Sequence, residues 1–284
     1  MDRKQPSSLD YETLLHELAL NSWRKSLLER DFPRALQNAE KLARSRDPFW
    51  RWQGALDLAV THLCQGRSES SREALETAKA CFREVPGFRA PAFEIEAHFW
   101  LETGRPHRAL DAVRGASTET PVLSYFRGLA HARLADLDAA ASVARDLGRS
   151  GAPLELALSH HVRAETHPGT AVETLIEGAS ILSRREADPS TAGILVRFAL
   201  ASALFERGRL KSALHVFDEV LYDNETVLYW PIPFIRALFF RGRIRALHGD
   251  FSGASGDGER LLSYWGMGDL DLERIDEARQ WVKS

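Results

Sequence analysis

Small residues recur along this chain at intervals of about 31 to 42 residues, each at the head of a segment expected to be a helix. Alternating runs of β-branched residues, which would indicate strands, are absent from the sequence. Such a recurrence is typical of helical pairs stacked into a solenoid, and it predicts an all-α protein whose surface holds another macromolecule. The recurring residues are Ala35, Ala74 or Ala78, Ala109, Ala140, Ala171, Ala213 and Ala254.

The most regular copy spans residues 197–217. It places Ala201 in a first helix, Gly208 in the turn and Ala213 in a second helix, four residues before Phe217. An alanine lets two helix backbones approach, and a glycine supplies the left-handed conformation that ends a helix. This copy resembles a tetratricopeptide repeat (TPR). The resemblance implies a right-handed α-solenoid of about seven helix pairs, closed by a C-terminal capping helix.

The other copies keep these offsets loosely. In the second copy the register stays open, because a count from Gly66 favours Ala74, whereas Phe82, four residues beyond Ala78, favours the latter. The copy around Ala171 is the least regular. Spacing lengthens after this residue, which predicts longer helices in the last repeats.

Prolines fall at the opposite phase, between the second helix of one repeat and the first helix of the next. Because proline disfavours helix in the residue before it, we expect these prolines to stop the incoming helix. The two series together predict seven helix pairs and a final helix. The prolines are Pro48, Pro91, Pro121, Pro153, Pro189 and Pro231.

We expect one solenoid domain over residues 11–284, after a flexible segment over residues 1–10. Shorter repeats extend to about residue 185, longer repeats cover residues 186–263, and the capping helix covers residues 270–283.

The stretch from Leu261 to Arg279 resembles the closing segment of the TPR regions attached to some bacterial serine/threonine kinases and sensor proteins. In those regions a tryptophan, a short acidic turn and a terminal helix cap the array. The kinase glycine-rich loop, Val-Ala-Ile-Lys strand and His-Arg-Asp loop do not occur in this sequence. The resemblance therefore implies the scaffold part alone.

The composition argues against a nucleic-acid-binding protein. The net charge is −3, and phosphate binding is largely electrostatic. The first residues lack the apolar stretch of a secretory signal, and no apolar run is long enough to span a membrane, so we expect a cytoplasmic protein without membrane insertion. Cys64 and Cys81 are expected to be buried helix residues.

The densest set of metal-ligating residue types is His160, His161, Glu165 and His167. Its spacing matches no established zinc signature. We therefore predict no metal, no cofactor and no catalytic residue.

The TPR resemblance implies a binding groove on the concave surface, lined by the first helix of each pair. Projection onto this surface gives an aromatic groove with two arginines toward one end, and such side chains often anchor a partner. The competing interpretation is that the aromatic residues pack between helices, because a shift of one residue in register turns a groove position into a core position. The groove candidates are Glu94, His98, Tyr125, Phe198, Ser202, Phe205, Arg236, Phe239, Phe240 and Arg243.

Tyr229 and Trp230 lie between two repeats, beside two prolines, and are candidates for a second interface. The alternative is that Trp230 fills the gap between two helix pairs.

These observations predict a non-catalytic scaffold or adaptor that binds a peptide or helix of another protein in the groove. The alternative is a structural subunit that forms homo-oligomers through the faces or ends of the solenoid. A metal-dependent enzyme is the least supported reading.

Overall fold

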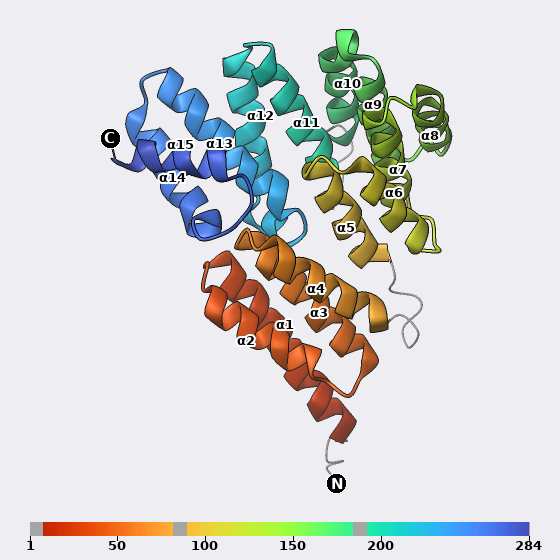
Figure 1. The fold of residues 1–284 in the computed structure, drawn as a ribbon, viewed down its shortest axis with the longest axis vertical. Coiled ribbons are helices and arrows are strands. Elements are labelled where there is room, and N and C mark those ends of the chain that lie inside the picture. The colour runs from red at the N-terminus through yellow and green to blue at the C-terminus, as the bar shows by residue number, and fades with distance from the viewer. Residues whose placement is uncertain (1–7, 82–89, 184–191, 284) are drawn as a thin grey trace, which may run out of the picture.

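The computed structural model describes residues 8–81, 90–183 and 192–283, which form fifteen α-helices, short 3₁₀ helices and no β-strand. Consecutive helices associate as seven pairs, and a fifteenth helix packs against the last pair (Figure 1). The predicted all-α repeat of seven pairs and a final helix is confirmed. No helix within these ranges has the length and apolar character of a membrane span.

The first helices of the pairs, called helices A below, are α1 (Ser8–Leu28), α3 (Pro48–Cys64), α5 (Ala90–Glu102), α7 (Pro121–Arg133), α9 (Pro153–Thr166), α11 (Gly193–Glu206) and α13 (Pro231–Leu247). The second helices, called helices B, are α2 (Phe32–Ala43), α4 (Ser68–Ala80), α6 (Pro106–Gly115), α8 (Leu137–Arg149), α10 (Ala171–Ser183), α12 (Leu210–Tyr222) and α14 (Phe251–Trp265). The remaining elements are η3 (Pro168–Thr170), η4 (Asn224–Leu228) and the final helix α15 (Leu272–Lys283).

Six of the seven turns within the pairs end helix A in the same way. One residue adopts the left-handed conformation, with φ between 59° and 79°. The N–H of the next residue donates to the carbonyl five residues back, as Asp31 does to Ser26 at 2.8 Å, which is the Schellman arrangement. Glycine supplies four of these turns, as predicted. The six left-handed residues are Arg30, Gly66, Gly104, Ala135, Gly208 and Gly249.

The small residue of helix B lies five positions after the left-handed residue. In the second pair this position is Ser71, whose side chain is buried and donates to the Ala59 carbonyl at 3.0 Å. Ser71 is small enough for this position, so neither Ala74 nor Ala78 is the residue equivalent to the alanines of the other pairs. The equivalent residues in the other five pairs are Ala35, Ala109, Ala140, Ala213 and Ala254.

The described prolines of the antiphase series separate helix B of one pair from helix A of the next, as predicted. They do so by opening helices A, not by stopping helices B, so that part of the expectation was wrong. In the first turn of a helix the amide hydrogen has no intrahelical partner, so proline loses nothing there. Pro189 lies outside the described residues. The others are the first residue of a helix at Pro48, Pro121, Pro153 and Pro231, and the second residue at Pro91.

The predicted lengthening of the last helices is wrong for α11 and α12. These helices have 14 and 13 residues, as α9 and α10 have. The wider spacing arises partly because η4 separates α12 from α13. The 17 residues of α13 equal the length of α3.

The helical pairs curl until the last pair meets the second (Figure 1). Trp265, at the end of α14, is buried and its indole N–H donates to the Leu63 carbonyl at 2.9 Å. The backbone N–H of Asp269 donates to the Gly66 carbonyl at 2.8 Å, and its carboxylate accepts from the N–H of Ser68 at 3.1 Å. The pairs therefore form a closed ring, called the ring below.

The closure is also apolar. Trp23, Phe234 and Trp265 belong to one continuous cluster of buried side chains that runs through the ring. Cys64 and Cys81 are buried and free, as predicted, and the Cys64 thiol lies 3.8 Å from the Val227 carbonyl, across the closure.

Substituting Gly66→Ala should test the closure against a matched control. A methyl group at Gly66 would lie 3.2 Å from the Gly268 Cα atom and 3.1 Å from the Trp265 ring, whereas one at Gly104 would meet nothing within 4 Å. Both glycines have nearly the same φ, +70° and +71°. We expect both alanine variants to lose about 1 kcal/mol from left-handed strain. Gly66→Ala should lose at least about 1 kcal/mol more from overpacking.

Urea unfolding of the two variants checks this prediction. Equal losses would contradict the tight contact between Gly66 and Gly268.

Candidate functional site

Trp230 divides the concave space of the ring. This residue, between η4 and α13, is 5% exposed, and its ring centroid lies 5.2 Å from that of His98 and 5.9 Å from that of Phe126. Trp230 is therefore packed between helix pairs, in agreement with the alternative interpretation of its role. The side chain of its neighbour Tyr229 is 41% exposed. A larger cavity lies among helices A of pairs three to seven, and a smaller one among those of pairs one to three.

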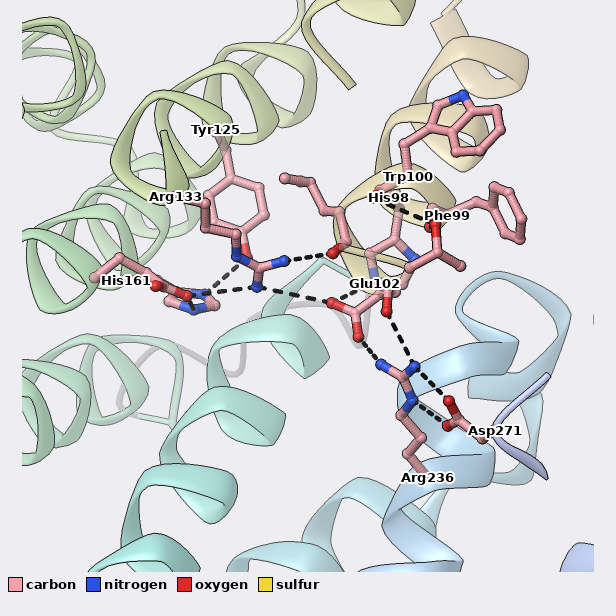
Figure 2. A network of polar contacts seen from close by, with 12 residues as sticks. His98, Phe99, Trp100, Glu102, Tyr125, Arg133, His161, Arg236 and Asp271 are labelled. Atoms are coloured by element: carbon pink, nitrogen blue, oxygen red, sulfur yellow. Dashed lines mark hydrogen bonds and ion pairs between the residues drawn. The ribbon is translucent and has the colours of Figure 1, made fainter. Parts of the chain in front are cut away.

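The larger cavity has a volume of about 570 Å³. Helices α5, α7, α9, α11 and α13 supply most of its wall, with contributions from α10 and α15. Several of its polar side chains belong to the network in Figure 2, which also includes Asp271. The predicted groove residues that line it are His98, Tyr125, Phe198, Ser202, Arg236 and Phe240.

The other four groove candidates do not line this cavity. Glu94 lines the smaller one. Phe239 is buried and its ring stacks on that of Trp281 at 5.4 Å, so the competing interpretation of helix packing holds for it. Phe205 packs against another phenylalanine of the cluster. The Arg243 side chain is 46% exposed and forms an ion pair with a glutamate of α15.

Arg236 is held between two carboxylates (Figure 2). Its guanidinium donates to both oxygens of Asp271, at 2.6 and 3.0 Å, and to the carboxylate of Glu102. Burial opposes the charged form of Glu102 and Asp271, but Arg236 overrides it and lowers the pKa of both carboxyls. The three side chains connect α5, α13 and the start of α15, so the ion pairs of Arg236 stabilise the fold.

Arg133 continues the network toward α9 (Figure 2). Its guanidinium donates to the Leu101 carbonyl at 2.7 Å and lies 3.5 Å from the Glu165 carboxylate and 4.0 Å from that of Glu102. These ion pairs lie on the inner wall of the ring and connect three successive helices A.

The projection from sequence missed Glu102, Arg133 and Glu206. Inward positions follow an interval of four residues, as in Glu94, His98 and Glu102, so the third position lies eight residues after the first. The projection had placed it at seven, which selected Phe205 in place of Glu206. An unbroken four-residue step would have found all three.

His98 and His161 occupy equivalent places, each about 3.9 Å from the glutamate one turn later. The Tyr125 hydroxyl lies 2.7 Å from Nδ1 of His161. Burial lowers the pKa of both histidines to about 4, so both are neutral at pH 7.

The four candidate metal ligands turn to different partners. His160 faces Glu177 on α10 at 3.6 Å, while Glu165 pairs with Arg133 and His167 is exposed. Among the residues with described side chains, no group of three or more His, Cys, Asp or Glu is arranged to hold a metal ion.

Comparison with known proteins finds no matching family model and no matching curated protein. Among solved structures, the chain is similar to a tetratricopeptide repeat protein from Parabacteroides merdae, at 16% identity and a TM-score of 0.47, over 95% of this chain and 100% of that one. It is also similar to the TPR domain of P58(IPK), at 14% identity and a TM-score of 0.32, over 94% and 79% of the two chains. Both are structures of the family that the sequence resembles, and the helical pairs of this chain carry the repeat architecture.

Arg236→Gln should be destabilising, by about 3 kcal/mol, because it removes the main cation from two buried carboxylates and leaves Asp271 with Arg274 alone and Glu102 with the more distant Arg133. Arg243→Gln is the matched control, since its ion pair is exposed, and it should change stability by less than about 0.5 kcal/mol. Chemical denaturation of both variants measures the difference, and similar values for the two would refute the buried network.

Acid should destabilise the protein between pH 6.5 and 4. The unfolded chain protonates His98 and His161 near pH 6.5, but the folded chain only near pH 4, so the unfolded state binds more protons in this window. The contribution of the two histidines to the free energy of unfolding is complete above pH 6.5. It is lost as the pH decreases, by at most roughly 3 kcal/mol per histidine. We expect the urea midpoint to fall from pH 7.5 to pH 5. The fall should be smaller in a His98→Gln/His161→Gln variant, and an equal fall would exclude these histidines as its source.

Proposed function

We propose that this protein is a non-catalytic interaction scaffold and that its larger cavity binds a short segment of a partner protein. The observation that carries the proposal is the open cavity of about 570 Å³ on the concave surface, lined by helices A of five successive pairs. Binding of a segment on a surface built from several repeats fits the extended concave faces of solenoid proteins.

The α11 wall favours an apolar anchor. Phe198 on α11 and Phe240 on α13 face the cavity, and the small residues Ala199 and Ala203 leave room beside them. The two phenylalanine rings belong to one packed cluster, with centroids 6.3 Å apart, so the apolar floor is rigid. A leucine, methionine or aromatic side chain of a partner would bury its surface here without rearranging the helices.

Polar groups beside this floor favour a peptide with a carboxylate next to its apolar anchor. The Ser202 hydroxyl is buried and has no hydrogen-bond partner, so it is free to pair with a partner's backbone. Arg207 and Arg274 line the cavity with side chains about one-third exposed. They pair with Glu173 and Asp271, and a guanidinium group has enough N–H donors to bind a second carboxylate.

Assembly through the C-terminal end of the solenoid is less supported. The turn at Gly66 and the loop at Gly268 cover each other within the chain, and Tyr264 packs against Phe32 with ring centroids 6.0 Å apart. These surfaces would have to separate before they could pair with a second copy.

The substitution Ala203→Phe should test the cavity by filling it. Ala203 lines the cavity from α11, so a phenyl group there occupies the space of the proposed anchor. Ser212→Phe, on the exposed face of α12, adds the same group outside the cavity and is the control. We expect peptides selected by wild-type protein from a random display library to bind Ala203→Phe at least about tenfold more weakly, and Ser212→Phe unchanged.

Fluorescence anisotropy of the selected peptides measures the affinities, and circular dichroism shows that both variants fold. If no peptide is enriched, or if the peptides bind Ala203→Phe as tightly as wild type, the cavity is not a peptide site. Light scattering of the wild type then distinguishes a homo-oligomer from a monomer.

A further inference from the structure

The smaller cavity, of about 310 Å³, has a different chemistry. It lies among α1, α3 and α5 and is closed by residues 228–230, on the opposite side of Trp230 from the proposed peptide site. Three indoles form much of its wall, from Trp23, Trp52 and Trp230. Its volume is at the lower end of the range for small-molecule sites.

Asp57 lines this cavity as a buried carboxyl without a cation of its own. Its side chain is 2% exposed, and one oxygen accepts a hydrogen bond from Gln53 at 2.7 Å. The other oxygen, Oδ2, is buried and has no partner. Burial raises the pKa of this carboxyl well above its usual value. A buried oxygen in this state calls for a ligand, since buried polar groups are almost always paired.

Asp257 shows how the same protein satisfies a buried aspartate elsewhere. Its side chain is 3% exposed, and it accepts hydrogen bonds from Arg241 and from Arg245, the latter at 2.8 Å. Asp57 is hydrogen-bonded to the neutral amide of Gln53, whereas Asp257 is paired with two guanidinium groups. Arg24 is the arginine whose charge acts on Asp57, but it is exposed, and its guanidinium donates to the Tyr229 hydroxyl at 3.3 Å.

A second carboxyl and the indole groups complete the cavity. Glu94 accepts a hydrogen bond from the Thr120 hydroxyl at 2.7 Å and lines the same wall. The indole N–H of Trp23 donates to Thr61 at 2.9 Å, which fixes this ring in place. The indole N–H of Trp230 is buried without a partner. The cavity thus offers aromatic faces, two carboxyls and the indole N–H of Trp230, and its wall also includes the exposed Arg24, whose guanidinium is bonded to Tyr229.

We propose that the smaller cavity binds an aliphatic ammonium group, with Asp57 as its counter-ion and the three indoles as its walls. A cation beside an aromatic face is attracted by the ring, most strongly for tryptophan. An ammonium ion also supplies the hydrogen-bond donor that Oδ2 of Asp57 lacks. The group belongs either to a free amine or to a lysine side chain of a partner. This inference does not depend on the peptide site.

Isothermal titration of the whole protein with three probes tests the proposal. Pentylammonium represents a free amine, 1-pentanol is its neutral analogue, and Nα-acetyl-lysine N-methylamide represents a lysine in a chain. We expect pentylammonium to bind with 1:1 stoichiometry and 1-pentanol to bind at least about tenfold more weakly. Equal binding of amine and alcohol, or binding of neither amine nor lysine amide, overturns the proposal.

The substitution Asp57→Asn replaces a carboxyl that can ionise beside a bound cation by a neutral amide of nearly the same shape, so it should weaken pentylammonium binding at least about tenfold. It also removes an uncompensated buried carboxyl, so we expect no drop in the thermal midpoint, which separates lost binding from lost folding. Asp111→Asn, at an exposed aspartate of α6, is the control and should bind as wild type does.

The probes also identify the source of the cation. If the lysine amide binds as tightly as pentylammonium, the site holds a lysine of a partner. If only the free amine binds, the ligand is a small molecule. Asp57→Asn binding pentylammonium as tightly as wild type refutes the site, and leaves the peptide proposal unaffected.

Discussion

Gly66 and Gly268 approach so closely that a Cβ atom at Gly268 would lie 2.7 Å from the backbone of Gly66. This contact, with the indole of Trp265 beside it, brings the loop after α14 against the turn of the second pair. Trp230 packs against His98 of α5 and Phe126 of α7, on the inner side of the ring. An open solenoid would present one continuous concave groove. Because the pairs close into a ring, the concave space becomes two cavities instead.

The two cavities use the same helix for opposite chemistry. On α5, Glu94 faces the smaller cavity and His98, one turn later, faces the larger. In the larger cavity the carboxylate of Glu102 is neutralised by Arg236, so this part of the wall is charge-balanced and held in place. In the smaller cavity Asp57 has no such ion pair, and its buried oxygen Oδ2 has no hydrogen-bond partner. On the two proposals made above, one short chain would therefore recognise two different kinds of ligand.

The repeat architecture could be predicted from sequence because each pair is a local unit. A turn glycine such as Gly208 and a small residue such as Ala213 act within a few positions of each other. The closure could not be predicted, because Trp265 and Leu63 are 202 residues apart and no periodic pattern links them. Arg236 looked like a partner anchor for the same reason, since its partner Glu102 lies 134 residues away.

The contact between Gly66 and Gly268 also changes how the protein comes apart. A linear repeat array frays, because a terminal repeat has one neighbour and separates at the cost of one interface. In this ring the last pair gains another interface, with the second pair, so the last pair is not a free terminus of the array. To separate the last pair from the ring, the contact between Gly66 and Gly268 and the interface with the preceding pair must therefore break together. We therefore expect the closed ring to unfold more cooperatively than a linear repeat array, whose repeats can melt one after another.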